Sequence, residues 1–362
     1  GNLASTLYEL GKHAEAEAMQ REVLAARREV LGPRNPSTLM PMDNLAATLQ
    51  ALGKHAEAEA MQREVLAARR EVLGSRHPDT LLALDNLALT LQALGKHDAF
   101  VRIGTNEVPL GAMELDVNSE QLTALPESIG KLQALTTLDV RNNQLTELPA
   151  AIGSLTALTS LDVSGNQLKE LPKAIAGLRK LMNLAMSGNQ LTGLPYLICH
   201  LAALVEFDVS NNQLTSLSGI AGLTVLRKLH VMGNQLTFLP AEIGSLTELT
   251  TLDVRNNQLL KLPAEIGSLS ALTTLNVMGN QLGILTAEIG GLAALTTLDV
   301  RNNQLTELPT EIGSLTALTK LDVSGNPLQL PPLPVAERGP AAIRAYFEDL
   351  ARRGPSRVSK AK

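Results

Sequence analysis

Apolar side chains recur along residues 135–330 in one arrangement, with each apolar pair split by a polar position and followed by an asparagine. The commonest form is Leu-x-Val-x-x-Asn-x-Leu, as at Leu138, Val140, Asn143 and Leu145. Alternating apolar and polar positions predict a short strand in each copy, and a fixed period predicts that the copies stack as layers. The steps are 23 residues with one of 22, and the asparagines are Asn143, Asn166, Asn189, Asn212, Asn234, Asn257, Asn280, Asn303 and Asn326.

The asparagine of each copy stands where the chain must turn away from its strand. Its amide offers two donors and an acceptor, so a column of stacked asparagines can pair backbone groups that the turn would bury. An unpaired buried group costs about 1–3 kcal/mol. We therefore interpret the nine asparagines as a structural ladder rather than as binding residues.

A tenth, degenerate layer precedes these nine, because the segment MELDVNSEQL at 113–122 fits the frame with Glu120 in the asparagine position. Such departures are typical of terminal repeats. Period and frame together are those of a leucine-rich repeat. The sequence predicts an α/β leucine-rich-repeat solenoid, a curved parallel sheet of ten layers.

A second period of 42 residues occupies the front of the chain. Residues 11–32 reappear letter for letter at 53–74, and the tripeptide Asn-Leu-Ala begins at 2, 44 and 86. Apolar residues at helical spacing predict helices over 37–52, 55–73 and 79–94. We expect an all-α tetratricopeptide-type helical hairpin array, in which the second helix buries Ala58, Met61, Val65, Ala68 and Val72.

Where one period gives way to the other, the third 42-residue unit loses its second helix. Either residues 98–111 pack against the helix left without a partner, or two repeat genes are fused. Residues 340–353 predict an amphipathic helix that covers the last layer. The predicted organisation is helical repeats at 1–96, a junction at 97–111, leucine-rich repeats at 112–332, and a capping helix with a basic tail at 333–362.

Both repeat types carry specific resemblances. The unit with Asn-Leu-Ala, Leu-Gly-Lys-His and Ala-Glu-Ala-Glu-x-Met is similar to the tetratricopeptide repeats of kinesin light chains, which implies peptide binding in a helical groove. The 23-residue array resembles cytosolic leucine-rich repeats of Ras-pathway scaffolds, plant intracellular Ras-group proteins and Roco-type proteins. That resemblance implies a protein-binding surface.

Composition narrows the class of partner. The net charge of −5 gives little support to nucleic-acid binding, which depends on neutralising phosphates with basic side chains. No apolar run reaches the ~20 residues that a membrane span needs. The single cysteine, Cys199, cannot form an internal disulfide, and Asn-x-Ser/Thr occurs only with a proline inside it, at residues 35–37. Both facts favour a cytoplasmic protein. We expect no cofactor and no small-molecule substrate.

Two outward columns run along the predicted strands. The first contains seven carboxylates, and Arg141, Arg255 and Arg301 stand two residues after three of them. Three interpretations are open: a solvated acidic face, a strip that docks a basic or mixed-charge protein, or a divalent-metal site, which a linear spread of carboxylates disfavours. The carboxylates are Asp116, Asp139, Asp162, Asp208, Asp253, Asp299 and Asp322.

The acidic column changes character between repeats four and six, and this interruption is our candidate protein-binding site. It combines apolar, basic and histidine side chains, which is typical of an interface centre, although sequence drift would produce the same irregularity. The candidate residues are Met182, Asn183, Glu206, Asp208, Arg227, Lys228, His230 and Met232, with Arg255 and Arg301 beyond them.

Catalysis has little support in the sequence. The adjacent Cys199 and His200 lack a third orienting group, and no phosphate-binding Gly-x-x-x-x-Gly-Lys-Ser/Thr occurs. We predict a non-catalytic interaction scaffold that docks partners on the concave leucine-rich-repeat face, with the helical groove as a second surface. The alternatives are a regulatory segment of a larger signalling enzyme, a kinase or Roco-type GTPase, and a purely structural tandem array.

Overall fold

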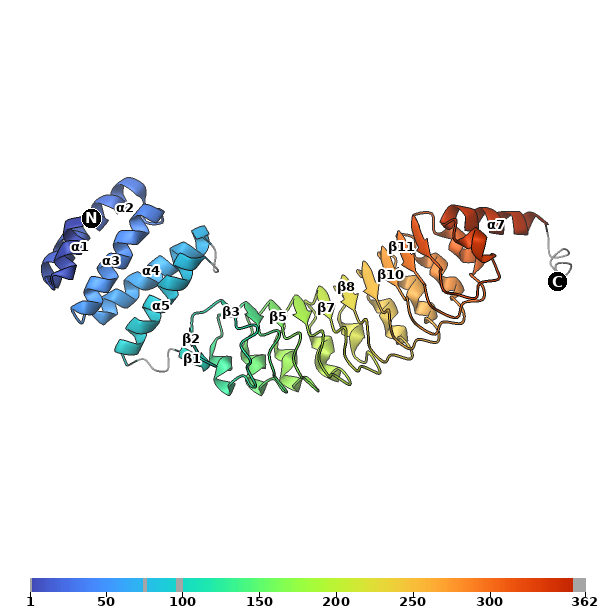
Figure 1. Ribbon diagram of the computed structural model, residues 1–362, viewed down its shortest axis with the longest axis horizontal. Coiled ribbons are helices and arrows are strands. Elements are labelled where there is room, and N and C mark those ends of the chain that lie inside the picture. The colour runs from blue at the N-terminus through green and yellow to red at the C-terminus, as the bar shows by residue number, and fades with distance from the viewer. Residues whose placement is uncertain (1, 74–76, 96–99, 354–362) are drawn as a thin grey trace. The chain divides into compact units, whose positions relative to one another are not determined.

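The computed structural model describes residues 2–73, 77–95 and 100–353. Contacts divide the chain into two compact units, Gly1–Glu114 and Leu115–Lys362 (Figure 1). We call the first unit the helical unit and the second the repeat sheet. The predicted basic tail lies, from residue 354 onwards, outside the described residues.

The described residues of the helical unit form five α-helices, whose bounds match the prediction closely. The third and fifth helices each begin and end one residue earlier than predicted. Asn35 explains the earlier start of the third, because its side chain accepts a hydrogen bond from the Ser37 N–H at 2.9 Å and so caps the helix. The helices are α1 Asn2–Glu9, α2 His13–Leu31, α3 Pro36–Ala51, α4 His55–Leu73 and α5 Pro78–Ala93.

The core of this unit lies between α3, α4 and α5. Met42 and Leu49 of α3 are fully buried, and Val65 of α4 is 1% exposed. Ala58 and Ala68 are buried as predicted, but Val72 is 48% exposed, so that prediction was wrong. The buried stripe ends one turn before the helix does.

The junction forms a β-hairpin that the sequence pattern did not predict. Strands β1, Phe100–Ile103, and β2, Asn106–Pro109, pair in antiparallel register. Phe100 packs against the helical core, and β2 contacts α5. The hairpin therefore covers part of the surface that a second helix of the third unit would have covered.

The repeat sheet has ten parallel strands in sequence order, which confirms the predicted ten-layer solenoid. The copies pair in constant register, for example Leu138 with Leu161. In Figure 1 the strands lie side by side along one face, and the helical turns lie on the opposite side. The strands are β3 Glu114–Asp116, β4 Thr137–Asp139, β5 Ser160–Asp162, β6 Asn183–Ala185, β7 Glu206–Asp208, β8 Lys228–His230, β9 Thr251–Asp253, β10 Thr274–Asn276, β11 Thr297–Asp299 and β12 Lys320–Asp322.

The layers of β3 to β11 each close through a short 3₁₀ turn on the side opposite the strand. In most layers a proline precedes the turn and an isoleucine within the turn is buried, as at Pro149 and Ile152. Phe207 occupies a leucine position in β7 and is fully buried, so its aromatic ring belongs to the core. The turns are Glu127–Lys131, Ala150–Ser154, Lys173–Gly177, Tyr196–His200, Ile220–Gly222, Ala241–Ser245, Ala264–Ser268, Ala287–Gly291 and Thr310–Ser314.

The asparagine ladder joins each layer to its neighbour by side-chain hydrogen bonds. Asn166 is typical: its Oδ1 accepts from the Leu145 N–H at 3.0 Å, and its Nδ2 donates to the Val140 and Val163 carbonyls, both at 3.0 Å. At the start of the ladder, Asn143 Oδ1 accepts from the N–H groups of both Glu120 and Leu122. These bonds pair backbone groups that the turns bury.

The residue just before each ladder asparagine matters in a different way. Asn142 and Gly165 hold this position in consecutive layers, with φ of 54° and 65°. A Cβ added at Gly165 would come within 2.4 Å of the Asn142 Oδ1 atom. Asparagine and glycine adopt this left-handed conformation at little cost, and of the two only glycine avoids the close contact with Asn142 Oδ1 at position 165.

Two helices, α6 Leu333–Ala336 and α7 Pro340–Arg353, follow the last strand. Ile343 and Phe347 of α7 are buried. Arg344 donates to the carbonyls of Gly313 and Leu315 at 2.9 and 3.2 Å. The helix α7 thus contacts the last layer and satisfies two of its exposed carbonyls.

Candidate protein-binding face of the repeat sheet

The candidate surface consists of the outward side chains of β3–β12, and we call it the strand face. In each strand these side chains flank the buried leucine, and parallel register places equivalent positions in straight columns. Asp139 of β4, for example, stands beside Asp162 of β5. The acidic column of the sequence is therefore a real column on the sheet.

Its carboxylates have a structural task that the sequence analysis missed. Asp139 Oδ1 accepts a hydrogen bond from the Arg141 N–H at 3.1 Å. In each of the other aspartate layers the carboxylate likewise accepts a hydrogen bond from the N–H two residues later, at 2.9–3.2 Å. The acidic column is thus in part a set of caps for the strand ends. A purely solvated face was the wrong description for Asp139 and Asp253, which are 6% and 8% exposed.

Three layers depart from this pattern. Asn276 replaces the aspartate and still accepts from the Met278 N–H at 3.1 Å, so the cap needs an acceptor and not a charge. Ala185 has no acceptor to offer. His230 occupies the same position in β8, and within the described residues no hydrogen bond joins its ring to the Met232 N–H. Both of the layers that lack this cap belong to the candidate site.

The three arginines of the second column neutralise carboxylates in pairs. Arg141 lies 3.2 Å from Asp139 and 3.9 Å from Asp162 of the next layer. Arg301 repeats this arrangement with Asp299 at 2.6 Å and Asp322 at 3.4 Å. Arg255 contacts Asp253 at 3.0 Å. Because these side chains are partly exposed, solvent screens the pairs and each contributes little to stability.

Burial and pairing shift the pKa values of this column in opposite senses. Burial raises the pKa of the Asp139 carboxyl, and it outweighs the hydrogen bond from the Arg141 N–H and the charge of that arginine, both of which lower it. The hydrogen bond to Asp299 raises the pKa of the Arg301 guanidinium. Burial therefore disfavours the charged form of Asp139, even though Arg141 lies beside it.

The candidate residues of β6, β7 and β8 do come together. Register places Asn183, Glu206 and Lys228 in one row across three adjacent strands. A second row holds Asp208 and His230. Met182 directly precedes Asn183 in the sequence and is 46% exposed.

Ion pairs give this cluster a mixed charge rather than a basic one. Lys228 Nζ lies 2.6 Å from Glu206 Oε1, so two of the candidate residues bind each other. Arg227 lies 3.9 Å from Glu248, a partner that the sequence analysis did not single out because it belongs to the next repeat. Both pairs are exposed, so a partner can exchange them at small cost.

The two outlying arginines are less close to the cluster. Arg255 stands two residues after the end of β9, the neighbour of β8, and therefore borders the cluster. Arg301 follows β11, three strands from β8, and its guanidinium is engaged by two aspartates. We therefore take the cluster on β6–β9 as the candidate site and treat Arg301 as separate.

Other chemistry finds no support in the described parts of the chain. Cys199 and His200 end the 3₁₀ turn opposite the strands and so do not belong to the strand face. Within residues 2–73, 77–95 and 100–353, no three His, Cys, Asp or Glu side chains are grouped so that they could hold a metal ion. Nor does any helix in these ranges have the length and apolar character to cross a membrane.

Family comparisons agree with both halves of this description. Residues 1–71 and 40–99 match the tetratricopeptide repeat. Residues 111–168 and 224–282 match the leucine rich repeat, 143–231 the leucine-rich repeat region, and 293–335 leucine rich repeats in two copies. The chain joins tetratricopeptide repeats to leucine-rich repeats. Both are typical protein-interaction modules, and no enzyme family appears among these matches. Comparison with curated proteins gave no match.

Solved structures similar to this chain are leucine-rich-repeat proteins and receptors. The ectodomain of the receptor kinase GASSHO1/SCHENGEN3 from Arabidopsis thaliana is 33% identical over 61% of this chain and 28% of its own, with a TM-score of 0.55. A TDR receptor is 28% identical over 61% of this chain and 44% of its own, with a TM-score of 0.50. The protein LIC12759 of Leptospira interrogans is 31% identical over 65% of this chain and 70% of its own, with a TM-score of 0.44.

Proposed function

We propose that this chain is a non-catalytic scaffold that docks a protein partner on the strand face, centred on the cluster of β6–β9. The observation that carries the proposal is the coincidence of two changes at one place. Ala185 and His230, the two layers without the capping hydrogen bond, lie one strand to either side of Asp208. At the same place the face becomes mixed in charge and partly apolar, which is a composition suited to an interface centre.

The partner class follows from the chemistry of the cluster. Met182 offers exposed apolar surface, and the exposed pair Lys228–Glu206 offers one charge of each sign. A mixed-charge protein surface with an apolar centre complements this arrangement better than a polyanion does. The similar GASSHO1 ectodomain is known in complex with CASPARIAN STRIP INTEGRITY FACTOR 2, which supports a binding role for such an array. We also place the protein in the cytoplasm, because its sequence has a single cysteine.

The test is affinity capture on the intact chain, with partners identified by mass spectrometry and then retested as purified proteins. His230→Asp combined with Met232→Glu changes the cluster, while the matched pair Leu260→Glu and Lys261→Asp changes two exposed residues beyond the strands. We expect a partner of the cluster to lose at least about tenfold in affinity, or 1.4 kcal/mol, with the first pair only. If neither variant loses affinity for the partner, the proposed site is contradicted. If both variants lose affinity equally, the loss does not come from the cluster, and the proposed site is again contradicted.

A further inference from the structure

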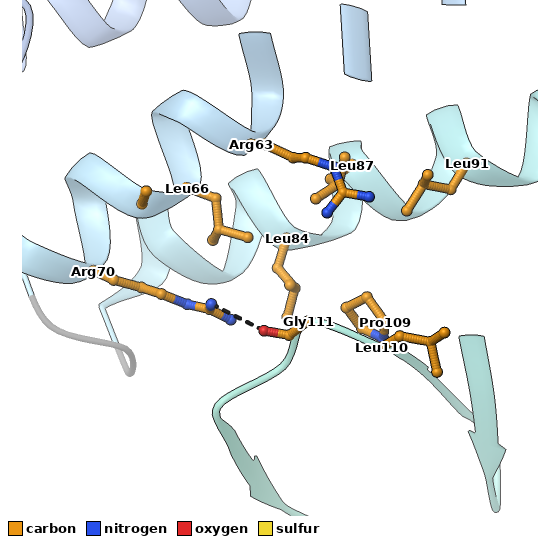
Figure 2. A pocket seen from close by; sticks show the side chains of 10 residues that line it. Arg63, Leu66, Arg70, Leu84, Leu87, Leu91, Pro109, Leu110 and Gly111 are labelled. Atoms are coloured by element: carbon orange, nitrogen blue, oxygen red, sulfur yellow. Dashed lines mark hydrogen bonds between the residues drawn. The ribbon is translucent and has the colours of Figure 1, made fainter. Parts of the chain in front are cut away.

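One pocket of the helical unit is lined by arginines and leucines, and it lies where the 42-residue pattern stops. It has a volume of about 230 Å³ and is formed by α4, α5 and the segment after β2 (Figure 2). Leu66, Leu87 and Leu91 supply apolar walls, and Arg63 and Arg70 of α4 line the pocket as well. That volume admits the side chains of one helix face rather than a whole helix.

The same arginines occur one unit earlier, where they bind a helix. Residues 13–31 and 55–73 are identical, so Arg21 and Arg28 of α2 are the counterparts of Arg63 and Arg70. Arg21 lies 2.6 Å from Glu57 of α4, and Arg28 lies 2.7 Å from Glu64. Within the chain, this arginine pair thus recognises two glutamates that stand seven residues apart on α4, the equivalent helix of the next unit.

Among the described residues, no helix offers the arginine pair of α4 two such glutamates. Arg63 contacts Glu59 on its own helix, the counterpart of the Arg21–Glu17 contact, and the described residues hold no second ion-pair partner for it. Among the described residues no carboxylate lies within ion-pair distance of Arg70, whose guanidinium donates to the Gly111 carbonyl at 3.3 Å (Figure 2). Burial lowers the pKa of Arg70 and outweighs the charge of Glu114, which raises it. A carboxylate would form a shorter and stronger bond there than a carbonyl does.

We propose that this pocket docks an amphipathic α-helix of a partner protein, one that carries two glutamates a heptad apart. Two helical turns separate Arg63 from Arg70, a rise of about 10.5 Å, and the same rise separates glutamates at i and i+7. The glutamates bind the arginines, and the aliphatic side chain between them enters the leucine-lined pocket. The site lies wholly in the helical unit, so it adds a second docking surface to the proposed scaffold and rests on that function only for the class of ligand.

The chain itself supplies the probe. A fluorescent peptide with the sequence of residues 55–73, stapled on the face away from its glutamates to hold the helix, is titrated with the full chain and followed by anisotropy. We expect saturable binding that weakens at least tenfold in Arg63→Glu/Arg70→Glu. The control Arg179→Glu reverses an exposed charge in the repeat sheet and should bind as the unchanged chain does. Helical circular dichroism checks that each variant folds.

A charge exchange separates recognition from damage to the fold. A second peptide has lysine at the positions equivalent to Glu57 and Glu64; it should bind Arg63→Glu/Arg70→Glu better than it binds the unchanged chain. Failure of the first peptide to bind, or equal binding by the double variant, overturns the proposal. Self-association of the chain that the double variant abolishes, without peptide binding, would assign the pocket to a second copy instead. None of these outcomes depends on the strand face, so either proposal can fail alone.

Discussion

Substituting one ladder asparagine measures how much its side-chain hydrogen bonds contribute to the free energy of unfolding. Asn212 accepts from the Leu191 N–H at 3.0 Å and donates to the carbonyls of Met186, Val209 and Ser210 at 3.0, 3.1 and 3.1 Å. Asn212→Ala removes all four bonds, and the groups left behind are buried away from water. At about 0.5–1.5 kcal/mol net for each bond, we expect the free energy of unfolding to fall by about 2–6 kcal/mol.

Urea unfolding followed by circular dichroism measures this loss as a shift in midpoint at constant slope. The neighbouring substitution Gln213→Ala is the control, because that side chain is exposed and should change stability by less than about 0.5 kcal/mol. A loss below about 1 kcal/mol for Asn212→Ala would refute the reasoning, since it would mean that the four backbone groups find other partners. Equal losses for both substitutions would refute it as well.

Two further predictions concern positions beside the ladder. Asp139→Asn should keep the cap on the Arg141 N–H, as Asn276 does, whereas Asp139→Ala should cost about 1 kcal/mol in urea unfolding. Because burial raises the pKa of Asp139, ionisation of this carboxyl destabilises the fold. The free energy of unfolding of Asp139→Asn, relative to that of the unchanged chain, should therefore increase as pH rises through that pKa. A difference that stays constant with pH would contradict this prediction. Gly165→Ala should cost at least about 1 kcal/mol in melting experiments because of its positive φ and the nearby Asn142 Oδ1, and a neutral result would contradict the close contact.

The sheet could be predicted from the sequence because each layer repeats one local rule. The period placed the ten strands, and the buried Leu138 and Val140 follow from alternation alone. The hairpin of residues 100–109 could not be predicted in this way, since it occurs once and no second copy exposes its pattern. It is held by contacts with the helical core, and such contacts leave no periodic signal.

The candidate site shows the same division. The columns could be read from the 23-residue step, but the capping bond of Asp139 could not, because an outward carboxylate looks the same in sequence whether it is solvated or bonded to the backbone. The ion-pair partner of Arg227 could not be predicted for a related reason. Glu248 lies in the next repeat, and which of the nearby carboxylates Arg227 contacts depends on side-chain conformations in the folded chain. Spacing predicts columns, whereas side-chain geometry decides what each column does.

His230 allows fold and recognition to be separated at a single residue. In eight of the nine other layers this position holds an aspartate or asparagine that caps the N–H two residues later, and the described structure shows no such bond from His230. His230→Asn should supply the missing acceptor for Met232 without adding a charge between Asp208 and Asp253, and so should raise the free energy of unfolding by about 0.5–1.5 kcal/mol. Urea midpoints measured beside those of Asn276→His, which makes the reverse change in β10, provide the comparison. Should His230→Asn lower stability while Asn276→His leaves it unchanged, the histidine would have a packing role, and a binding role for it would lose its support. A gain in stability would instead mean that the sequence at His230 forgoes an available hydrogen bond, as a residue retained for contact with a partner would.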